Sequence, residues 1–322
     1  LGAVYDLRRI VKSHDPDYMR WTQWIFLKFY EAGLAYRANA PVNWCPGCQT
    51  VLANEQVLAD GTCERSGDAV EKRNLEQWFY RITDYAQELL DDLDDLEWPD
   101  KVKVMQRNWI GRSEGAEFGL PIADGDGNAR TDVEPLTIYT TRPDTTFGMT
   151  FAVMSPEHPR VAELTTDGRR ADVEAFVAEV AGRSEIERLS EEGPADKRGV
   201  FTGTHVINPF TQKPVPLYLA DYVLMGYGTG AIMAVPGEDQ RDWDFAQAYG
   251  LDVIRTVQPP DAFDGEAYTG DGPTINSEWL NGLTMTEAKA KAIDWLSEQG
   301  HGTAKVNFRL RDWLLSRQRY WG

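Results

Sequence analysis

Residues 228–242 have the sequence GTGAIMAVPGEDQRD, and this run decides the class of fold. Residues 231–235 are an apolar run typical of a buried strand, which Pro236 and Gly237 end. Asp239 is a residue type that caps helices, so a helix is predicted to begin there and to carry Asp242 in its first turn. A strand that turns directly into a helix predicts a mixed α/β (α+β) domain with carboxylates at the junction.

The glycines before this strand, GYGTG at 226–230, resemble a dinucleotide-binding loop only superficially. That loop requires a helix after it and an acidic residue about 20 positions further on. Here the glycines lead into a strand, so a nicotinamide-dependent oxidoreductase lacks its required features. We expect the glycines to let a ligand or a neighbouring strand approach closely.

A second informative run is TTRPDTT at 140–146, which places four hydroxyls, one guanidinium and one carboxylate in a turn held by Pro143. The four histidines of the chain, at 14, 158, 205 and 301, all lie outside the two runs, which disfavours a serine triad. Hydroxyls and carboxylates instead suit a site that anchors a cationic, hydroxylated ligand and orients a water molecule.

Strand and helix patterns alternate irregularly around these runs, from Ser113 to about Phe308. The expected strands are 137–141, 147–154, 200–207, 215–219 and 230–235. The expected helices are 159–164, 173–181, 239–249 and 285–298. Before this region, the pattern predicts a helix from Asp15-Pro16 to about Gly33 and another over about 75–96, whose acidic tail we expect to be solvated.

Cys45, Cys48 and Cys63 outline a zinc-knuckle-like segment at 41–70. Zinc prefers four ligands in a tetrahedron, and a C-x-x-C turn supplies two of them. Ser66 stands in the fourth position, where a hydroxyl is a poor ligand at neutral pH, and Glu64 is a carboxylate that would substitute. The sequence leaves two alternatives open, a bound zinc ion or a packed fold with three free thiols.

The chain has 322 residues, a length that fits two domains, and a net charge of −18. Such an excess of acid argues against a surface that coats a nucleic-acid backbone, so any such contact would be local. No apolar run approaches the ~18 residues of a membrane span, and three cysteines favour a reducing, cytoplasmic compartment. The chain begins without Met, and we expect it to be part of a longer protein.

Seven strings along the chain are specific enough to indicate a family. They are YMRWTQW at 18–24, PVNWC at 41–45, TVLANEQV at 50–57, MQRNWIGRSEG at 105–115, TTRPDTTFG at 140–148, GTGAIMAVP at 228–236 and RDWLLSRQRYWG at 311–322. In this order they resemble the class I aminoacyl-tRNA synthetases, and the threonine-rich string resembles the leucyl members rather than the valyl or isoleucyl ones.

The resemblance implies an editing domain at 113–308, which would hydrolyse a wrong amino acid from the tRNA 3′ end. It implies a helical connective region at 1–112 and a basic strand or linker at 309–322 that returns to a catalytic body. The H-x-G-H and K-M-S-K-S signatures that handle ATP are absent from the chain, so we expect no amino-acid activation from it.

The partners that the resemblance implies are the 3′ end of tRNA(Leu), an amino acid such as norvaline or isoleucine, and the remainder of the synthetase. Editing would need no cofactor, whereas ATP and Mg²⁺ belong to the full-length enzyme. A monomer without membrane contact is expected.

The resemblance also implies roles for single residues. Thr140 and Thr141 would line the scissile ester and position the water or the developing oxyanion. Asp242 would hold the substrate α-ammonium, and Thr145 would keep the leucyl side chain out of the pocket.

Further residues would contact the rest of the substrate. Arg142 and Tyr227 would face the terminal adenosine, one by charge and the other by stacking. Met233 and Val235 would form the wall of the side-chain pocket.

The chain departs from the family at Glu238, where the family often has His. Glu238 is expected to line the site, as a base or as a ligand for a substrate hydroxyl, while Asp239 either orients a neighbour or only caps the helix. Two alternatives to an editing enzyme follow, a non-catalytic module that binds the tRNA end and a zinc-dependent structural module.

Overall fold

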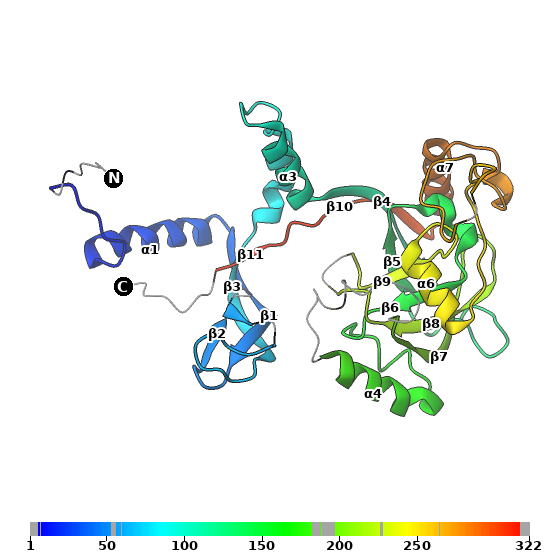
Figure 1. The fold of residues 1–322 in the computed structure, drawn as a ribbon, viewed down its shortest axis with the longest axis horizontal. Helices are drawn as coiled ribbons and strands as arrows, with labels where there is room; N and C mark the ends of the chain where they lie inside the picture. Colours follow the sequence, from blue (N-terminus) through cyan, green and yellow to red (C-terminus); the bar gives the residue numbers. More distant parts are fainter. Residues whose placement is uncertain are drawn as a thin grey trace. The chain divides into compact units, whose positions relative to one another are not determined.

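The computed structural model describes residues 6, 8–52, 56–58, 60–181, 188, 197–225, 228–263 and 265–315. The chain divides into two compact units. The first is formed by Leu1–Arg112 together with Phe308–Gly322, and the second by Ser113–Asn307 (Figure 1). The mixed α/β class predicted from the sequence is confirmed, because each unit combines helices with a sheet.

The first unit is built around an antiparallel sheet in the order β11-β3-β1-β2. Its strands are β1 (Ala35–Cys45), β2 (Thr50–Leu52), β3 (Glu71–Tyr80) and β11 (Trp313–Leu314). Its helices are α1 (Pro16–Glu31), the short η2 (Ile82–Tyr85), α2 (Ala86–Asp91) and α3 (Asp100–Ile110). The predicted first helix is confirmed, although the Asp15 side chain makes no capping hydrogen bond.

The predicted helix over 75–96 is wrong for most of its length. Residues 71–80 form β3, which pairs with β1 from Ala35↔Tyr80 to Trp44↔Glu71. This long-range pairing satisfies the backbone of β3 and overrides the local helical pattern. The acidic residues at 91–97 are exposed as expected, but they lie at the end of α2 and in the turns after it.

The second unit contains two sheets and most of the helices. One sheet has the order β10-β4-β5, and the other has the order β7-β8-β6-β9 with β6 parallel to β8. The strands are β4 (Arg112–Leu120), β5 (Leu136–Thr140), β6 (Phe151–Met154), β7 (Gly199–Ile207), β8 (Pro214–Ala220), β9 (Ala231–Ala234) and β10 (Gly302–Phe308). The helices are η3 (Pro143–Gly148), η4 (Asp167–Arg169), α4 (Arg170–Ala181), α6 (Gln240–Tyr249), η6 (Glu278–Leu280) and α7 (Met285–Glu298).

Two sequence predictions in this unit are corrected by the structure. Residues 159–164 form turns rather than a helix, and the Thr165 hydroxyl donates to the Val161 carbonyl oxygen at 2.6 Å, which closes the last turn on a side chain. The strand expected over 147–154 is shorter, because the turn of η3 extends to Gly148 and β6 begins only at Phe151.

Aromatic packing fixes α6 on the sheet of the second unit. Phe245 is fully buried and stacks on Phe151 of β6, with ring centroids 5.3 Å apart. This contact holds the first turn of α6 next to the end of β9, where the two informative runs of the sequence meet. Within the described residues, no helix is long and apolar enough to cross a bilayer.

Candidate functional site

The threonine-rich turn at 140–146 is held by hydrogen bonds that its own hydroxyls accept or donate. The amide of Arg142 donates to Thr140 Oγ1 at 3.0 Å. The hydroxyl of Thr145 donates to the Arg142 carbonyl oxygen at 2.9 Å, and that of Thr146 to the Pro143 carbonyl oxygen at 2.8 Å. Side chains that bond to nearby backbone in this way favour turns over helices or strands, so the turn is locally specified.

Arg142 forms an ion pair within the same turn. Its Nη2 lies 2.8 Å from Asp144 Oδ2, and Asp144 is fully buried while the Arg142 side chain is partly exposed. Burial acts to lower the pKa of Arg142, but the hydrogen bonds and charge of Asp144 outweigh it and the pKa is raised. Arg142 therefore stays a cation at the surface of the turn, with Asp144 as its fixed counter-ion.

The helix α6 begins with an acid-rich first turn. Asp239 is its N-cap and accepts hydrogen bonds from the amides of Arg241 at 2.8 Å and of Asp242 at 3.4 Å. Asp239 also pairs with the Arg241 guanidinium at 2.9 Å. Burial alone would raise the pKa of Asp239, but Arg241 and the helix amides lower it, so Asp239 is an ionised cap.

Asp242 is the buried carboxylate of the site, with an exposed fraction of 3%. Its Oδ1 accepts a hydrogen bond from the Tyr222 hydroxyl at 2.8 Å, and its Oδ2 accepts one from the Val235 amide at 2.8 Å. Burial and the nearby charge of Asp239 raise the pKa of Asp242 to about 7. A carboxyl group with such a pKa changes its charge in the physiological range, which is typical of functional sites.

Glu238 is anchored on the segment that follows α6. Its Oε1 accepts hydrogen bonds from the amides of Thr256 at 2.6 Å and Val257 at 3.1 Å, and burial raises its pKa. Its Oε2 is buried without a hydrogen-bond partner in the described part of the chain. Glu238 thus links the turn to the segment at 256–257. A histidine at this position could not do so in the same way, because an imidazole nitrogen accepts only one hydrogen bond.

Gly237 is required where this segment crosses the turn. A Cβ at Gly237 would lie 2.6 Å from the Ile254 carbonyl oxygen and 2.9 Å from Arg255 Cα, so no other residue fits without moving the backbone. The close approach brings Glu238 within reach of the amides that it accepts.

Several contacts bring the two runs of the sequence together. The Thr146 hydroxyl lies 3.5 Å from Met233 Sδ of β9. A Cβ at Gly148 would lie 3.1 Å from Val235 Cγ1, and Arg142 and Glu238 interact through their charges. The end of β5, the turn of η3, the end of β9 and the start of α6 therefore form one site.

The structure places nearly all the predicted site residues in this region. Those described are Thr140, Thr141, Arg142, Thr145, Met233, Val235, Glu238, Asp239 and Asp242. Tyr227 lies outside the described residues. Met233 and Val235 are buried, and Thr140 and Thr141 are half-buried at the end of β5.

Sequence reasoning missed Tyr222, which contacts Asp242 from a position 20 residues earlier in the chain. No motif marks this tyrosine, since it follows β8 in an ordinary apolar run. The sequence offered one signal for its role, which is that Tyr222 carries a hydroxyl and lies close to the glycines before β9.

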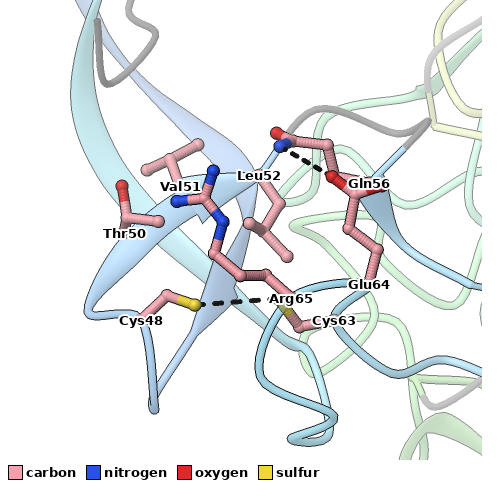
Figure 2. Close-up of a pocket in the computed structure, with 8 residues that line it drawn as sticks. All are labelled: Cys48, Thr50, Val51, Leu52, Gln56, Cys63, Glu64 and Arg65. Carbon is pink, nitrogen blue, oxygen red and sulfur yellow. Dashed lines mark hydrogen bonds between the residues drawn. The ribbon is translucent and has the colours of Figure 1, made fainter.

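The three cysteines converge in the first unit, as Figure 2 shows for two of them. Their Sγ atoms all lie within 4.8 Å of one another, and those of Cys48 and Cys63 are 3.9 Å apart. Zn–S bonds of about 2.3 Å in a tetrahedron place sulfurs about 3.8 Å apart, so the three thiols fit zinc. Backbone amides of Ser66 and Arg65 lower the pKa of Cys63 to about 6, which favours a thiolate ligand.

The fourth position of this cluster is a hydroxyl, since Ser66 Oγ lies 3.1 Å from Cys45 Sγ. Glu64, the carboxylate considered as a substitute, accepts a hydrogen bond from Gln56 at 3.2 Å and is not part of the cluster. A pocket of about 240 Å³ opens beside the thiols (Figure 2). It is lined by Cys48, Thr50, Val51, Leu52, Gln56, Cys63, Glu64 and Arg65.

Comparisons with known proteins agree with both units. Residues 107–297 match the family model of the leucyl-tRNA synthetase editing domain, and residues 1–114 match that of the class I tRNA synthetases for I, L, M and V. A leucine–tRNA ligase of Nocardioides sp. is 56% identical over 331 residues, covering 100% of this chain and 38% of the relative. One of Roseiflexus castenholzii is 54% identical, covering 100% of this chain and 37% of the relative.

A solved structure resembles this chain over most of its length. It is the LeuRS of Agrobacterium radiobacter K84 in a ternary complex with tRNA and LeuAMS, with a TM-score of 0.71 and 41% identity. The match covers 96% of this chain and 35% of that one. This chain therefore spans well under half the length of the proteins that it is similar to.

Proposed function

Since the chain belongs to the leucyl-tRNA synthetases and contains their editing domain, we propose that it hydrolyses the ester of mischarged tRNA(Leu). The observation that carries this proposal is the buried carboxylate of Asp242, held beside the threonine-rich turn. A buried carboxylate suits the substrate α-ammonium, since charge-assisted hydrogen bonds strengthen where water is excluded.

The proposed reaction is the attack of one water molecule on the ester carbonyl carbon. The bond between that carbon and the ribose oxygen breaks, and the proton released by the water ends on the ribose oxygen. The products are the free amino acid and the 3′ hydroxyl of the tRNA. We assign the orientation of the water and of the developing oxyanion to Thr140, Thr141 and nearby backbone amides.

The sequence left open a role for Glu238 as general base, and its hydrogen bonds make that role less suitable. One of its oxygens accepts two backbone amides, and loss of this anchor would release the segment at 256–257. We therefore assign Glu238 to holding the turn, since its second oxygen is buried. Asp239 is the helix cap that accepts the Asp242 amide, and its ionised carboxylate also acts on the Asp242 side chain through its charge.

The remaining contacts of the substrate follow from the same geometry. The Thr145 hydroxyl is bonded to the Arg142 carbonyl oxygen, so its methyl group is left as the steric gate against leucine. Met233 and Val235 wall the side-chain pocket. Arg142, kept charged by Asp144, and Tyr227 would face the terminal adenosine.

An editing site compensates for the limited selectivity with which a binding pocket distinguishes similar amino acids. One methylene is worth only ~1–3 kcal/mol in an apolar pocket, so a leucine site cannot reject smaller aliphatic amino acids strongly. A second pocket that admits norvaline or isoleucine and excludes leucine supplies the missing selectivity. The proposal includes the remainder of a synthetase and the tRNA 3′ end as partners, a monomeric state, and a cytoplasmic location for the three free thiols.

The cysteine cluster contributes to this proposal only through the fold. Cys45, Cys48 and Cys63 would hold a zinc ion with the Ser66 hydroxyl beside it, and zinc there would stabilise the hairpin of β1 and β2. ATP and Mg²⁺ are assigned no part in the editing step.

The test is deacylation of norvalyl-tRNA(Leu) and isoleucyl-tRNA(Leu) by the chain and by two variants. Asp242→Ala should lower kcat/KM about 100-fold, because a charge-assisted contact in a buried site is lost. Asp244→Ala is the matched control, since Asp244 is also buried in α6 but bonds to Gln240. Equal rates for the chain and for Asp242→Ala would remove the role of Asp242, and rates no higher than spontaneous hydrolysis would favour a non-catalytic module that binds the tRNA end.

A further inference from the structure

Tyr222 is a buried tyrosine whose hydroxyl reaches the editing site from outside both sequence motifs. It follows β8, is 4% exposed, and donates a hydrogen bond to Asp242 Oδ1 at 2.8 Å. Its ring packs against Phe245 at a centroid distance of 5.8 Å, within the aromatic cluster that fixes α6 on the sheet. The ring therefore has a fixed position from which its hydroxyl reaches Asp242.

We propose that Tyr222 is a positioning residue of the editing site, whose phenol fixes the Asp242 carboxylate in the orientation and charge state that bind the substrate ammonium. This inference rests on the proposed function, because it concerns the carboxylate to which that function assigns the ammonium.

Both oxygens of the Asp242 carboxylate are held by hydrogen-bond donors. Asp242 has one hydrogen bond on each oxygen, from Tyr222 to Oδ1 and from the Val235 amide to Oδ2. Two donors on opposite oxygens fix the rotation of the carboxylate about its last bond, whereas one donor would leave that rotation free. Because each carboxylate oxygen can accept two hydrogen bonds, each still has one acceptor site for an ammonium.

The charges around Asp242 make a donor necessary. Burial and the charge of Asp239 raise the pKa of Asp242, whereas the Val235 amide, the Tyr222 hydroxyl and Arg241 lower it. Lys197 lies over the Tyr222 ring, with Nζ 5.9 Å from the centroid. Burial and Asp242 raise the pKa of Tyr222 well above its usual value, so the phenol keeps its proton and acts only as a donor.

Removing the hydroxyl should therefore leave Asp242 protonated at neutral pH more often. A hydrogen bond to a charged group in a buried site corresponds to a pKa change of about one to two pH units. From a pKa of about 7, a rise of about one unit lowers the ionised fraction at pH 7 about fivefold. At pH 8.5 the two forms should differ little.

The chain offers a matched control in Tyr249. Its hydroxyl is also hydrogen-bonded inside the protein, to the Gly199 amide at 2.7 Å and to the Gly199 carbonyl oxygen at 2.9 Å, and its ring stacks on Phe245 at 4.3 Å. Tyr249→Phe removes a phenol from the same aromatic cluster without touching Asp242. Any general loosening of the cluster should appear in both variants.

The experiment measures the Asp242 carboxyl directly and the reaction separately. The pKa of Asp242 is read by ¹³C NMR of aspartate-labelled protein, assigned with Asp242→Asn, in the chain, Tyr222→Phe and Tyr249→Phe. Tyr222→Phe should raise this pKa by about one pH unit and lower kcat/KM about fivefold at pH 7, with recovery at pH 8.5. Tyr249→Phe should change neither the pKa nor the shape of the profile.

The outcomes separate the two hypotheses. An Asp242 pKa that is the same in Tyr222→Phe and in the chain overturns the inference. If the pKa rises but the chain shows no deacylation, the proposed function fails while the coupling of the two residues stands. Should Tyr222→Phe not fold, protein containing 3-fluorotyrosine gives the same test, because a more acidic phenol donates more strongly and should lower the Asp242 pKa.

Discussion

The two units of the chain bury their aromatic side chains to different extents. In the second unit, Phe151 and Phe245 are fully buried and stack on each other. In the first unit, Trp109 of α3 is 72% exposed, and Trp21 and Trp24 of α1 are also largely exposed. The apolar clusters of the first unit are small, and one of them consists mainly of the three cysteines with Leu52.

The extent of burial determines where in the chain a carboxylate can be desolvated. A carboxylate is desolvated only where a large apolar core surrounds it, as the aromatic cluster of the second unit does for Asp242. The buried clusters of the first unit are too small for that, and its part-buried carboxylate Asp312 is satisfied by Tyr36 and Thr83. Its stability is therefore expected to depend on the cysteine cluster and on partly exposed aromatic contacts between α1 and β3, such as Phe29 on Tyr80, rather than on a closed core.

The largest predicted effect is on stability and tests the comparison directly. Phe245→Ala should cost ~3–5 kcal/mol of unfolding free energy in the second unit, because it leaves a cavity in a packed aromatic cluster. Trp109→Ala, which removes an equally large but exposed ring, should cost less than about 0.5 kcal/mol. Hydrogen exchange of peptides from each unit measures the two changes in unfolding free energy. Similar changes for the two variants would contradict the difference in burial between the units.

The elements that the sequence predicted best are those with local signals. The helix expected over 285–298 matches α7, where Thr284 and Glu287 form a capping box. The helix expected over 239–249 matches α6, whose cap Asp239 was identified from the motif. Local chemistry of this kind depends on residues three or four positions apart, which a single sequence displays.

The features that the sequence did not predict depend on contacts between residues far apart in the chain. Residues 71–80 form a strand only because β1 lies beside them, and no local pattern reports that pairing. Tyr222 meets Asp242, and Glu238 meets the amides of Thr256 and Val257, across 18 to 20 positions. The roles of the site residues came from resemblance, and they stay predictions until variants are measured.

The next largest effect concerns the gate at Thr145. Thr145→Ser removes the methyl group but keeps the hydroxyl bonded to the Arg142 carbonyl oxygen, so hydrolysis of correct leucyl-tRNA(Leu) should rise at least tenfold. Thr145→Val keeps a methyl group in place and should leave leucyl-tRNA intact. Both are measured as rates of release of labelled leucine. Intact leucyl-tRNA with Thr145→Ser would remove the steric role.

A smaller effect, about tenfold, is expected at the cysteine cluster of the first unit. Ser66→Cys replaces the hydroxyl beside Cys45 with a fourth thiol, which completes a four-sulfur tetrahedron and should raise zinc affinity by about that factor. Competition with a chromophoric chelator measures the affinity, and Ser113→Cys, outside the cluster, is the control. Unchanged affinity in Ser66→Cys would show that Ser66 does not stand in the fourth position.

The smallest predicted effect is the pH dependence of the editing reaction. Asp242 has a pKa of about 7, so kcat/KM for norvalyl-tRNA(Leu) should rise about fivefold from pH 6 to pH 7, rise about twofold more by pH 8 and then level, as the carboxylate forms. Initial rates, corrected for spontaneous ester hydrolysis, measure the profile, and Asp244→Ala should share it. A flat profile between pH 6 and 8 would argue against Asp242 as the ammonium ligand.

The same pKa implies an opposite trend in stability, which makes this prediction more specific. The native pKa of Asp242 lies above its unfolded value of about 3.9, so the unfolded chain loses this proton first as pH rises. The contribution of Asp242 to stability is therefore complete below pH ~3.9 and is lost as pH rises through about 7. As pH rises toward 7, the carboxylate that we propose to bind the substrate ammonium forms while the fold loses that contribution. Activity and stability of the second unit should therefore change in opposite directions. A variant that lowers the Asp242 pKa should move both transitions together to lower pH.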